Sequence, residues 1–190
     1  MPTYRRIFTP GGAVFLTLVT FKRQPIFAEP NHVQLLRKAV STMKAEMPFD
    51  VTAAVILPDH IHFVWNLPQE DGNYSRRVGR LKILFTQFLR GKNSLPQDVG
   101  PSRQKHRESD VWKRRFWEYT LRDEEDWAQH LNYLHYNPVK HGLARCPHQW
   151  EYSSFRRFVG EGFYGMDWGC QCGGKAIEMN RFEQDLEVGA

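Results

Sequence analysis

The sequence has few cysteines, and none of its apolar runs is long enough to cross a membrane. Its three cysteines are an odd number, and Cys170 and Cys172 stand too close together to suggest a disulfide framework, which favours a reducing compartment. No stretch approaches the roughly 18 apolar residues that a transmembrane helix requires, and the first residues contain no apolar segment of signal-peptide length. We therefore expect a soluble cytoplasmic protein.

Composition indicates one folded domain. Of the 190 residues, 41% are hydrophobic and 14% aromatic, which is enough for a core. There are no repeats and no convincing linker. The formal net charge of +5 is compatible with an anionic partner, but it becomes informative only where the charge is clustered.

The apolar patterns predict four strands and three helices. Strand-like runs cover residues 13–21, 49–57, 60–67 and 114–121. Helical spacing follows Pro30, starts again at Ser75 as an N-cap, and runs from Asp123 to a stop at Pro138. A polar stretch at 93–112 predicts a mobile loop.

This order predicts an α+β protein with a ferredoxin-like split β-α-β sandwich. Its antiparallel sheet would carry helices on one face and could leave the other face open to a ligand. We expect the domain to cover residues 1–145 and a C-terminal extension, residues 146–190, to pack on it.

The hairpin strand at 60–67 contains two histidines one residue apart. Alternate side chains of a strand share a face, so His60 and His62 point to the side opposite Ile61, Phe63 and Trp65. The apolar set is expected to face the helices. Both imidazoles then lie side by side on the open face, close enough to bind one metal ion.

The third helix offers a further ligand and a nucleophile. At 100° per residue, Tyr133 and Asn137 fall together on one flank of the apolar stripe, with His130 beside them. If that flank meets the histidines, the carboxamide completes a three-ligand metal site one turn from a phenol. Such a site suits phosphodiester cleavage, with a metal that withdraws charge from phosphate and a tyrosine that attacks phosphorus.

Each of these residues also has an ordinary structural explanation. His60 and His62 would be solvated strand histidines, Tyr133 a half-buried packing residue, and Asn137 a helix stop before proline. The convergence of all four favours the functional interpretation.

Four stretches carry a resemblance to the REP-associated tyrosine transposases, which are single-tyrosine HUH transposases related to those of small insertion sequences. They are "YRRIFTPGGAVFLTLVTF", "VILPDHIHFVWNLP", "RRFWEYTLRDEEDWAQHLNYLHYNPVKHGL" and "WEYSSFRRFVGEGFYGMDW". The resemblance implies a nuclease that cuts single-stranded DNA beside imperfect bacterial hairpins, leaving a 5′-phosphotyrosine and a free 3′ hydroxyl. It also implies a nucleoid-associated protein, and we expect a monomer.

Position by position, the resemblance makes His60 and His62 metal ligands, Tyr133 the nucleophile and Asn137 the helix ligand. Tyr136 is the rival nucleophile, ranked second because it points away from the apolar stripe. The suspected proton acceptors are His130, His135 and His141.

The metal in this family is Mg²⁺ or Mn²⁺, although an imidazole pair suits Mn²⁺ or Zn²⁺ better. Cys170-x-Cys172 is a competing zinc candidate. Because it lacks a second ligand pair, we expect two ordinary thiols.

Basic residues cluster in two places. Between Ser75 and Lys92 there are six of them and no acid, which predicts a track for DNA phosphates, with a basic face that binds no ligand as the alternative. A second cluster lies near residue 114, and the resemblance adds an N-terminal motif that reads unpaired bases. The expected DNA contacts are Tyr4, Arg5, Arg6, Arg76, Arg77, Arg80, Lys82, Arg90, Lys92, Arg114 and Arg115.

Two other functions compete with a tyrosine transposase. The same basic surface could hold DNA hairpins as a regulator without cutting them. A hydrolytic metallonuclease could instead use the histidines to activate water, and it would leave no protein on the DNA.

Overall fold

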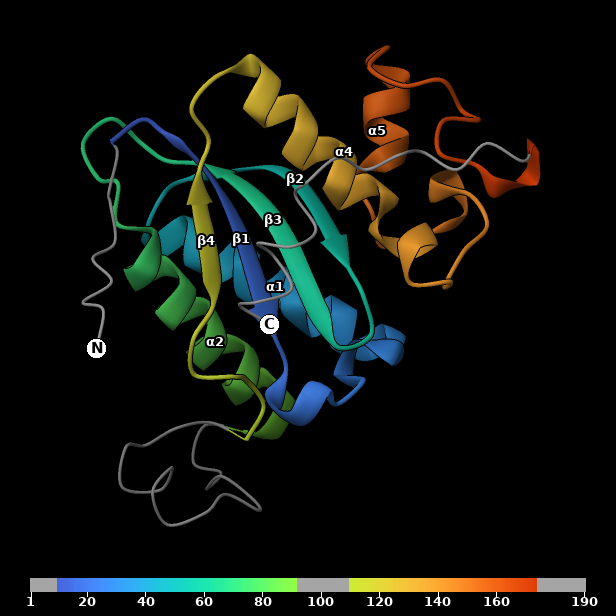
Figure 1. Cartoon of the computed structure of the whole chain (residues 1–190). Helices are drawn as coiled ribbons and strands as arrows, with labels where there is room; N and C mark the ends of the chain where they lie inside the picture. The colour runs from blue at the N-terminus through green and yellow to red at the C-terminus, as the bar shows by residue number, and fades with distance from the viewer. Residues whose placement is uncertain (1–9, 92–109, 174–190) are drawn as a thin grey trace, which may run out of the picture.

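The computed structural model describes residues 10–91 and 110–173, and its elements follow the predicted order (Figure 1). The strands are β1 (Ala13–Val19), β2 (Asp50–Ile56), β3 (His60–Asn66) and β4 (Trp117–Thr120). The helices are α1 (Pro30–Glu46), α2 (Tyr74–Arg90), α4 (Glu124–Lys140) and the short α5 (Phe155–Gly160).

The four strands form one antiparallel sheet in the order β2-β3-β1-β4. This is the strand order of the split β-α-β arrangement, with β1 and β3 in the centre. The prediction of an α+β ferredoxin-like fold is confirmed. The central register places Thr17 of β1 directly opposite His62 of β3.

One face of the sheet is covered by α1 and α2, which lie behind it in Figure 1. Ile61, Phe63 and Trp65 of β3 are buried there in one apolar cluster with Leu36 of α1 and Phe85 of α2. The period-two pattern therefore assigned these three side chains to the correct face.

The prediction of an open second face is wrong. A second apolar cluster fills it, in which Phe15 of β1 and Val64 of β3 pack with Leu134 of α4 and Phe158 of α5. The apolar stripe of α4 is narrow, but α5 adds apolar area beside it. The histidines of β3 therefore lie beneath a helix and not in solvent.

Two helix ends differ from the predictions. The N-cap of α2 is Asn73, not Ser75, because the Asn73 side chain accepts a hydrogen bond from the backbone nitrogen of Arg76 at 3.0 Å. The predicted start of the third helix at Asp123 is correct, since Asp123 caps α4 by accepting from the backbone nitrogen of Asp126 at 2.8 Å.

The predicted stop of α4 at Pro138 is also wrong, because the helix continues to Lys140. Proline lacks the N–H that would bond the preceding turn. The turn still closes, since the backbone nitrogen of His141 donates to the carbonyl of Asn137 at 3.0 Å. Gly142, with a φ of 67°, then ends the helix in the left-handed conformation that glycine adopts without strain. Asn137 is thus held inside the helix.

The segment after α4 packs on the outer edge of β2. The backbone nitrogen of Ile56 donates to the carbonyl of Tyr152 at 2.8 Å, and that of Ser154 donates to the carbonyl of Ala54 at 2.8 Å. These bonds cover part of an edge that would otherwise expose unpaired backbone groups. Of the expected extension, residues 174–190 lie outside the described residues.

The prediction of a mobile loop at 93–112 is wrong at its C-terminal end. Val111 and Trp112 are buried in the first core, and Trp112 bridges to Thr20 at the end of β1. The carboxylate of Asp110 pairs with Arg90. Residues 92–109 lie outside the described part of the chain.

Candidate active site

His60 and His62 lie side by side on β3 and are both buried. Their ring centroids are 5.0 Å apart, and the two residues are 5% and 2% exposed. This burial excludes a pair of solvated strand histidines. An imidazole removed from water needs defined partners for both ring nitrogens, so those partners indicate what the pair can bind.

A carboxylate fixes the proton position on His60. Nδ1 of His60 lies 2.6 Å from Oδ1 of Asp59, and Asp59 also accepts from Arg23 at 3.0 Å. Burial opposes the ionisation of Asp59, but these two hydrogen bonds outweigh it and hold its pKa below the ordinary value. An ionised carboxylate only accepts, so Nδ1 of His60 donates, and a neutral ring then carries its lone pair on Nε2.

That lone pair points at a second acceptor. Nε2 of His60 lies 3.4 Å from Oδ1 of Asn137, while Nδ2 of Asn137 is buried without a hydrogen-bond partner among the described residues. Two acceptors that face each other are mismatched unless a proton or a cation lies between them. A divalent ion bound to both atoms would remove the mismatch, so these residues fit a metal ion.

His62 presents a second nitrogen to the same place. Its Nδ1 is hydrogen-bonded to Oγ1 of Thr17 at 2.8 Å, and its buried Nε2 has no well-formed hydrogen bond within the described chain. Burial, followed by repulsion from Lys140 and from His60 and His141 whenever these carry a proton, holds the pKa of His62 well below its ordinary value. The ring is therefore neutral, the state that a metal ligand requires.

Tyr133 lies on α4, one turn before Asn137, and its ring packs against the histidines. The centroids of Tyr133 and His62 are 5.4 Å apart with the rings nearly perpendicular, and Phe15 lies on another side at 6.1 Å. Nζ of Lys140 lies 5.4 Å from the centre of the Tyr133 ring. The structure thus brings the predicted nucleophile and all three predicted metal ligands into one cluster.

Tyr136 lies in a different environment. Its ring contacts Trp168 of the C-terminal segment, with centroids 6.4 Å apart and nearly perpendicular. The helical geometry that placed Tyr136 away from the apolar stripe agrees with this contact.

The three other suspected histidines have different surroundings. Nδ1 of His130 is bonded to the carbonyl of Asp126 at 2.8 Å, and Nε2 of His135 to Oγ of Ser154 at 2.8 Å. Both rings are fully buried, which lowers the pKa of each, that of His135 to about 3. His141 is different because its exposed ring lies 5.2 Å from that of His60.

The predicted phosphate track on α2 needs correction at Arg77. This side chain is 1% exposed, and its guanidinium donates to the carbonyls of Asp71, Asn73 and Pro48 at 3.2, 3.2 and 2.9 Å. It also pairs with the carboxylate of Asp71 at 3.1 Å. Arg77 therefore holds the turn before α2, and its Nε, which has no hydrogen-bond partner among the described residues, is buried out of reach of DNA.

Three other cations of α2 have partners inside the protein. Arg80 donates twice to the carboxylate of Glu46, both at 2.6 Å. Lys82 donates to the carbonyl of Lys113 at 2.8 Å, and Arg90 pairs with Asp110. The missing acids of this helix are supplied by other elements, which the local sequence does not show.

The remaining predicted DNA contacts divide into two groups. The side chains of Arg76, Arg114 and Arg115 are exposed. Tyr4, Arg5, Arg6 and Lys92 lie outside the described residues. Moreover, α2 covers the face of the sheet opposite the histidines, so its basic side does not border the cluster.

Sequence reasoning missed three side chains that surround the site: Asp59, Thr17 and Lys140. Asp59 precedes His60 directly in the hairpin turn, and Lys140 follows Tyr133 by seven residues, which is two helical turns. Asp59 and Lys140 could therefore have been predicted from the sequence, Asp59 by its adjacency to His60 and Lys140 by its helical spacing from Tyr133. Thr17 could not, because its contact depends on the register between β1 and β3.

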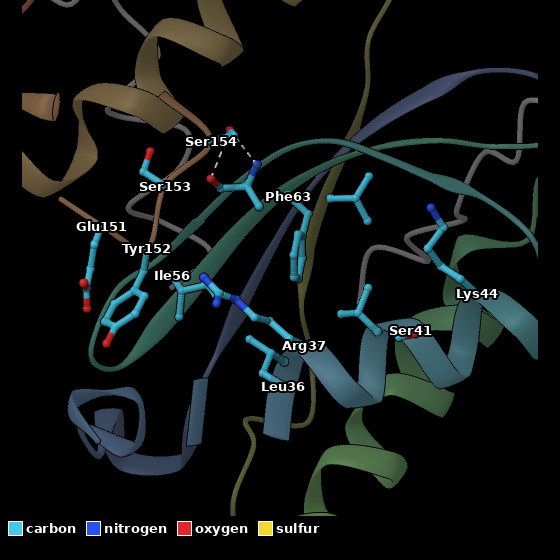
Figure 2. Close-up of a pocket in the computed structure, with 13 residues that line it drawn as sticks. Leu36, Arg37, Ser41, Lys44, Ile56, Phe63, Glu151, Tyr152, Ser153 and Ser154 are labelled. Carbon is cyan, nitrogen blue, oxygen red and sulfur yellow. Dashed lines mark hydrogen bonds between the residues drawn. The ribbon is translucent and has the colours of Figure 1, made fainter. Parts of the chain in front are cut away.

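A cavity of about 590 Å³ lies away from this cluster, between α1 and the edge of β2. Figure 2 shows Arg37, Lys44 and Tyr152 around it, with Phe63 at its back. None of the residues that line it is a histidine or a cysteine. The candidate metal ligands and nucleophile therefore lie elsewhere, between β3 and α4. In addition, no helix within the described ranges is long and apolar enough to span a membrane.

Fold and site together define a class: a ferredoxin-like protein with a His-hydrophobic-His strand beneath a helix that carries a tyrosine, as in DNA strand-transferring HUH enzymes. No family model matches the chain. Two relatives carry the family name REP-associated tyrosine transposase. One, from Haemophilus influenzae (strain ATCC 51907 / DSM 11121 / KW20 / Rd), is 43% identical over 89% of this chain and 94% of its own. The other, from Escherichia coli (strain K12), is 34% identical over 88% of this chain and 91% of its own.

A solved structure of the REP-associated tyrosine transposase bound to a REP hairpin is 30% identical to this chain, covers 96% of both chains and superposes with a TM-score of 0.74. The chain belongs to the family of REP-associated tyrosine transposases.

Proposed function

We propose that this protein cuts and rejoins single-stranded DNA beside REP-type hairpins through a 5′-phosphotyrosine, and that it does so as a monomer on the cytoplasmic nucleoid. The observation that carries the proposal is the convergence of two imidazoles, a carboxamide oxygen and a phenol ring between β3 and α4. The kind of DNA is taken from the similar solved structure, which is bound to a REP hairpin.

The ligands proposed for a divalent metal ion, Mg²⁺ or Mn²⁺, are Nε2 of His60, Nε2 of His62 and Oδ1 of Asn137. Supporting this choice, a carboxylate sets the tautomer of His60 and a hydroxyl orients the ring of His62. When bound, the ion would withdraw charge from a phosphate oxygen of the DNA.

In the proposed reaction, Oη of Tyr133 attacks a backbone phosphorus. The bond from phosphorus to the 3′ oxygen breaks, and that oxygen takes up a proton and leaves as a 3′ hydroxyl. The phenol loses its own proton, which has an ordinary pKa of about 10. The ammonium group of Lys140, over the ring, favours the phenolate electrostatically. His141, beside His60, is an exposed base within reach of the site.

Rejoining reverses these steps. A 3′ hydroxyl attacks the phosphotyrosine, the bond from phosphorus to Oη breaks, and the phenol regains a proton. The phosphotyrosine keeps the energy of the broken phosphodiester, so joining requires no nucleotide triphosphate. A different 3′ end at the same position would give strand transfer.

The DNA contacts that we retain lie at the surface. Exposed Arg76, Arg114 and Arg115 are proposed to bind phosphates, and Arg80, Lys82 and Arg90 would do so only after exchanging their partners within the protein. The N-terminal group Tyr4, Arg5 and Arg6 is proposed to read unpaired bases by stacking and hydrogen bonding, and Lys92 remains a proposed phosphate contact.

A second candidate function is hairpin binding without cleavage. It is favoured by the burial of the cluster, in which Tyr133 is 6% exposed and Asn137 is fully buried. A phosphate reaches these groups only after the side chains above them have moved. The covalent product distinguishes the two functions, and it also excludes a hydrolytic nuclease, which leaves no protein on DNA.

The test is to incubate the full chain with single-stranded oligonucleotides from the hairpins that flank its own gene, in Mn²⁺, and to score a covalent protein–DNA adduct on denaturing gels. We expect the native protein to form the adduct, Tyr133→Phe to abolish it without loss of hairpin affinity, and Tyr136→Phe, the matched control, to preserve it.

His60→Ala with His62→Ala should also abolish cutting. An adduct that survives in Tyr133→Phe and disappears in Tyr136→Phe would assign the nucleophile to Tyr136. Hairpin binding with no adduct from the native protein would establish the second candidate function.

A further inference from the structure

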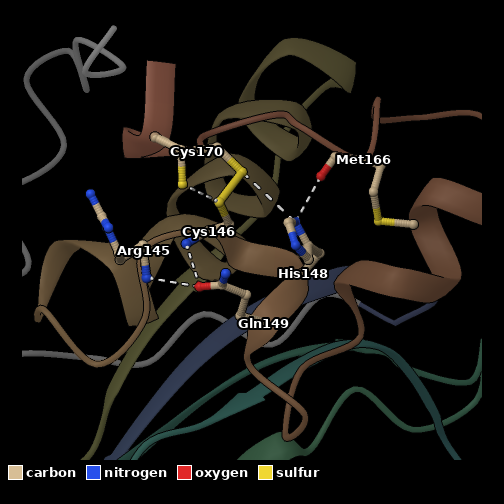
Figure 3. The surroundings of a disulfide bond; sticks show 7 residues. Arg145, Cys146, His148, Gln149, Met166 and Cys170 are labelled. Atoms are coloured by element: carbon tan, nitrogen blue, oxygen red, sulfur yellow. Dashed lines mark hydrogen bonds between the residues drawn. A yellow bond between two sulfur atoms is a disulfide. The ribbon is translucent and has the colours of Figure 1, made fainter. Parts of the chain in front are cut away.

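A cluster of sulfur and nitrogen atoms lies beyond α4, where two short 3-10 turns, η3 (Pro147–Gln149) and η4 (Gln171–Gly173), meet. Cys146 and Cys170 form a disulfide here (Figure 3). Sγ of Cys172 lies 3.4 Å from Sγ of Cys146, and Nδ1 of His148 lies 3.7 Å from Sγ of Cys170. Three cysteine sulfur atoms, two of them in the disulfide, and one imidazole therefore lie close together.

From this convergence we propose that the reduced chain binds a structural zinc ion through Cys146, His148, Cys170 and Cys172. A disulfide accounts for two of the four groups but not for the third sulfur, which lies against Cys146, or for the imidazole beside Cys170. In a tetrahedral zinc site with Zn–S of about 2.3 Å and Zn–N of about 2.0 Å, neighbouring ligand atoms are about 3.5–3.8 Å apart. The two separations of 3.4 and 3.7 Å are within about 0.4 Å of those edges, and the sulfur atoms of Cys146 and Cys170 would move apart to a third edge once their disulfide is reduced.

The chain spacing also fits, which corrects the expectation of two ordinary thiols. Cys170-x-Cys172 was rejected as a zinc site for want of a second ligand pair, and the fold supplies that pair as Cys146-x-His148. The ligand atoms of Cys146, His148 and Cys170 all lie within 4.8 Å of one another, whereas Sγ of Cys172 contacts the group at Cys146 and would have to move toward the other two to complete the site. The sequence separates the two pairs by 21 residues, so only the folded chain shows that they meet.

Hydrogen bonds order the first turn and join it to the second independently of the sulfur atoms. Oε1 of Gln149 accepts from the backbone nitrogens of Arg145 and Cys146 at 3.1 and 3.2 Å. The backbone nitrogen of Gln171 donates to the carbonyl of Arg145 at 2.9 Å. A ligand set that is already arranged by its surroundings loses little conformational entropy when it binds an ion.

Zinc binding must release protons. Three thiols lose theirs, and Nδ1 of His148, which is hydrogen-bonded to the carbonyl of Met166 at 3.0 Å, must give up that bond so that the ring proton moves to Nε2. Three thiolates and Zn²⁺ leave one net negative charge. Arg156 lies beside it, because its Nε donates to the carbonyl of His148 at 2.9 Å.

The site would fasten the C-terminal segment to the helix that carries the nucleophile. Between the two zinc pairs, Tyr164 donates its hydroxyl proton to Oδ1 of Asn132 on α4 at 2.9 Å, and Trp168 packs on Tyr136. Its role would therefore be to support α4 structurally, separate from the proposed metal at His60 and His62.

The test measures zinc in the full chain, purified with a reductant and without chelator, by elemental analysis. To exclude zinc held at the histidines of β3, His60→Ala/His62→Ala serves as the background. We expect about one zinc per chain in this background and loss of it in Cys172→Ser and in His148→Gln, neither of which removes a cysteine of the disulfide. Replacement of zinc by Co²⁺ should give the strong visible and charge-transfer absorption of a tetrahedral thiolate site, which needs no variant.

Four results would contradict a structural zinc site at these cysteines and His148. A reduced native chain that contains no zinc and gives no such Co²⁺ spectrum would overturn the proposal, as would zinc that persists in both variants. Zinc that disappears with His60→Ala/His62→Ala would assign it to the candidate active site. A chain whose mass shows the Cys146–Cys170 disulfide even after reduction would overturn it too.

Discussion

Arg77 provides a sharp test of how the structure assigns the basic residues of α2. Replacing it by methionine keeps much of the side-chain volume but removes every donor. Three partly buried carbonyls, of Asp71, Asn73 and Pro48, then lose their partner, and so does the carboxylate of Asp71. Hydrogen bonds from a charged group contribute about 1.5–3 kcal/mol each, and the loss of one partner of a buried ion pair costs about 3–5 kcal/mol.

Asp71 is partly exposed and regains water, so we assign no cost to its carboxylate and take the lower limit for the three hydrogen bonds, about 3–5 kcal/mol of unfolding free energy. For a chain of this length, that corresponds to a fall in Tm of roughly 6–20 °C. The measurement is equilibrium denaturation of both proteins, with Tm from a thermal scan as a second reading.

The adjacent residue supplies the matched control. Arg76→Met makes the same chemical change at an exposed position of the same helix, and we expect it to alter stability by less than about 0.5 kcal/mol. If Arg76 binds a phosphate, its loss also lowers the salt slope of hairpin affinity by about 1, whereas folded Arg77→Met keeps the native slope. A stable Arg77→Met protein with a reduced salt slope would refute the structural role and restore Arg77 to the DNA interface.

Three further predictions concern the candidate metal site. Asp59→Asn should weaken Mn²⁺ binding at His60 about 10–100-fold, as seen in a calorimetric titration, because the carboxylate that fixes the ring tautomer is lost; unchanged affinity would contradict that role. Thr17→Val should weaken it similarly by freeing the His62 ring, and Thr17→Ser should restore it. Saturating Mn²⁺, at about 100 times its Kd, should stabilise the native chain by about 2.7 kcal/mol, and this gain should vanish in His60→Ala.

The arrangement of the candidate site was largely predictable because it depends on two short sequence periods, the two-residue alternation of a strand and the 3.6-residue turn of a helix. The alternation of β3 assigned His60 and His62 to one face, and helical spacing put Tyr133 and Asn137 on one flank of α4. What remained was whether that flank faces that strand, which the ferredoxin-like topology answers. The second core, with Phe15, shows why the face is covered.

Features that depend on distant parts of the chain were missed. The acids that pair with the cations of α2 are Glu46, Asp71 and Asp110, none of which lies on that helix. For the same reason, the sequence did not show that Cys172 lies against Cys146, which is 26 residues away along the chain. A charge count over one helix reports its own residues, whereas pairing is decided by the elements that pack beside it.

The sharing of one helix by Tyr133 and Asn137 has a mechanical consequence. Both imidazoles, of His60 and His62, belong to the central sheet, whereas the phenol of Tyr133 and the carboxamide of Asn137 lie one turn apart on α4. If a cut strand were attached to that phenol, a movement of α4 away from the sheet would also withdraw Oδ1 of Asn137 from the position proposed for the metal ion. If the proposed site is correct, the complete set of ligands would exist only while α4 contacts the sheet, and a DNA end attached to Tyr133 would not react while the helix is displaced.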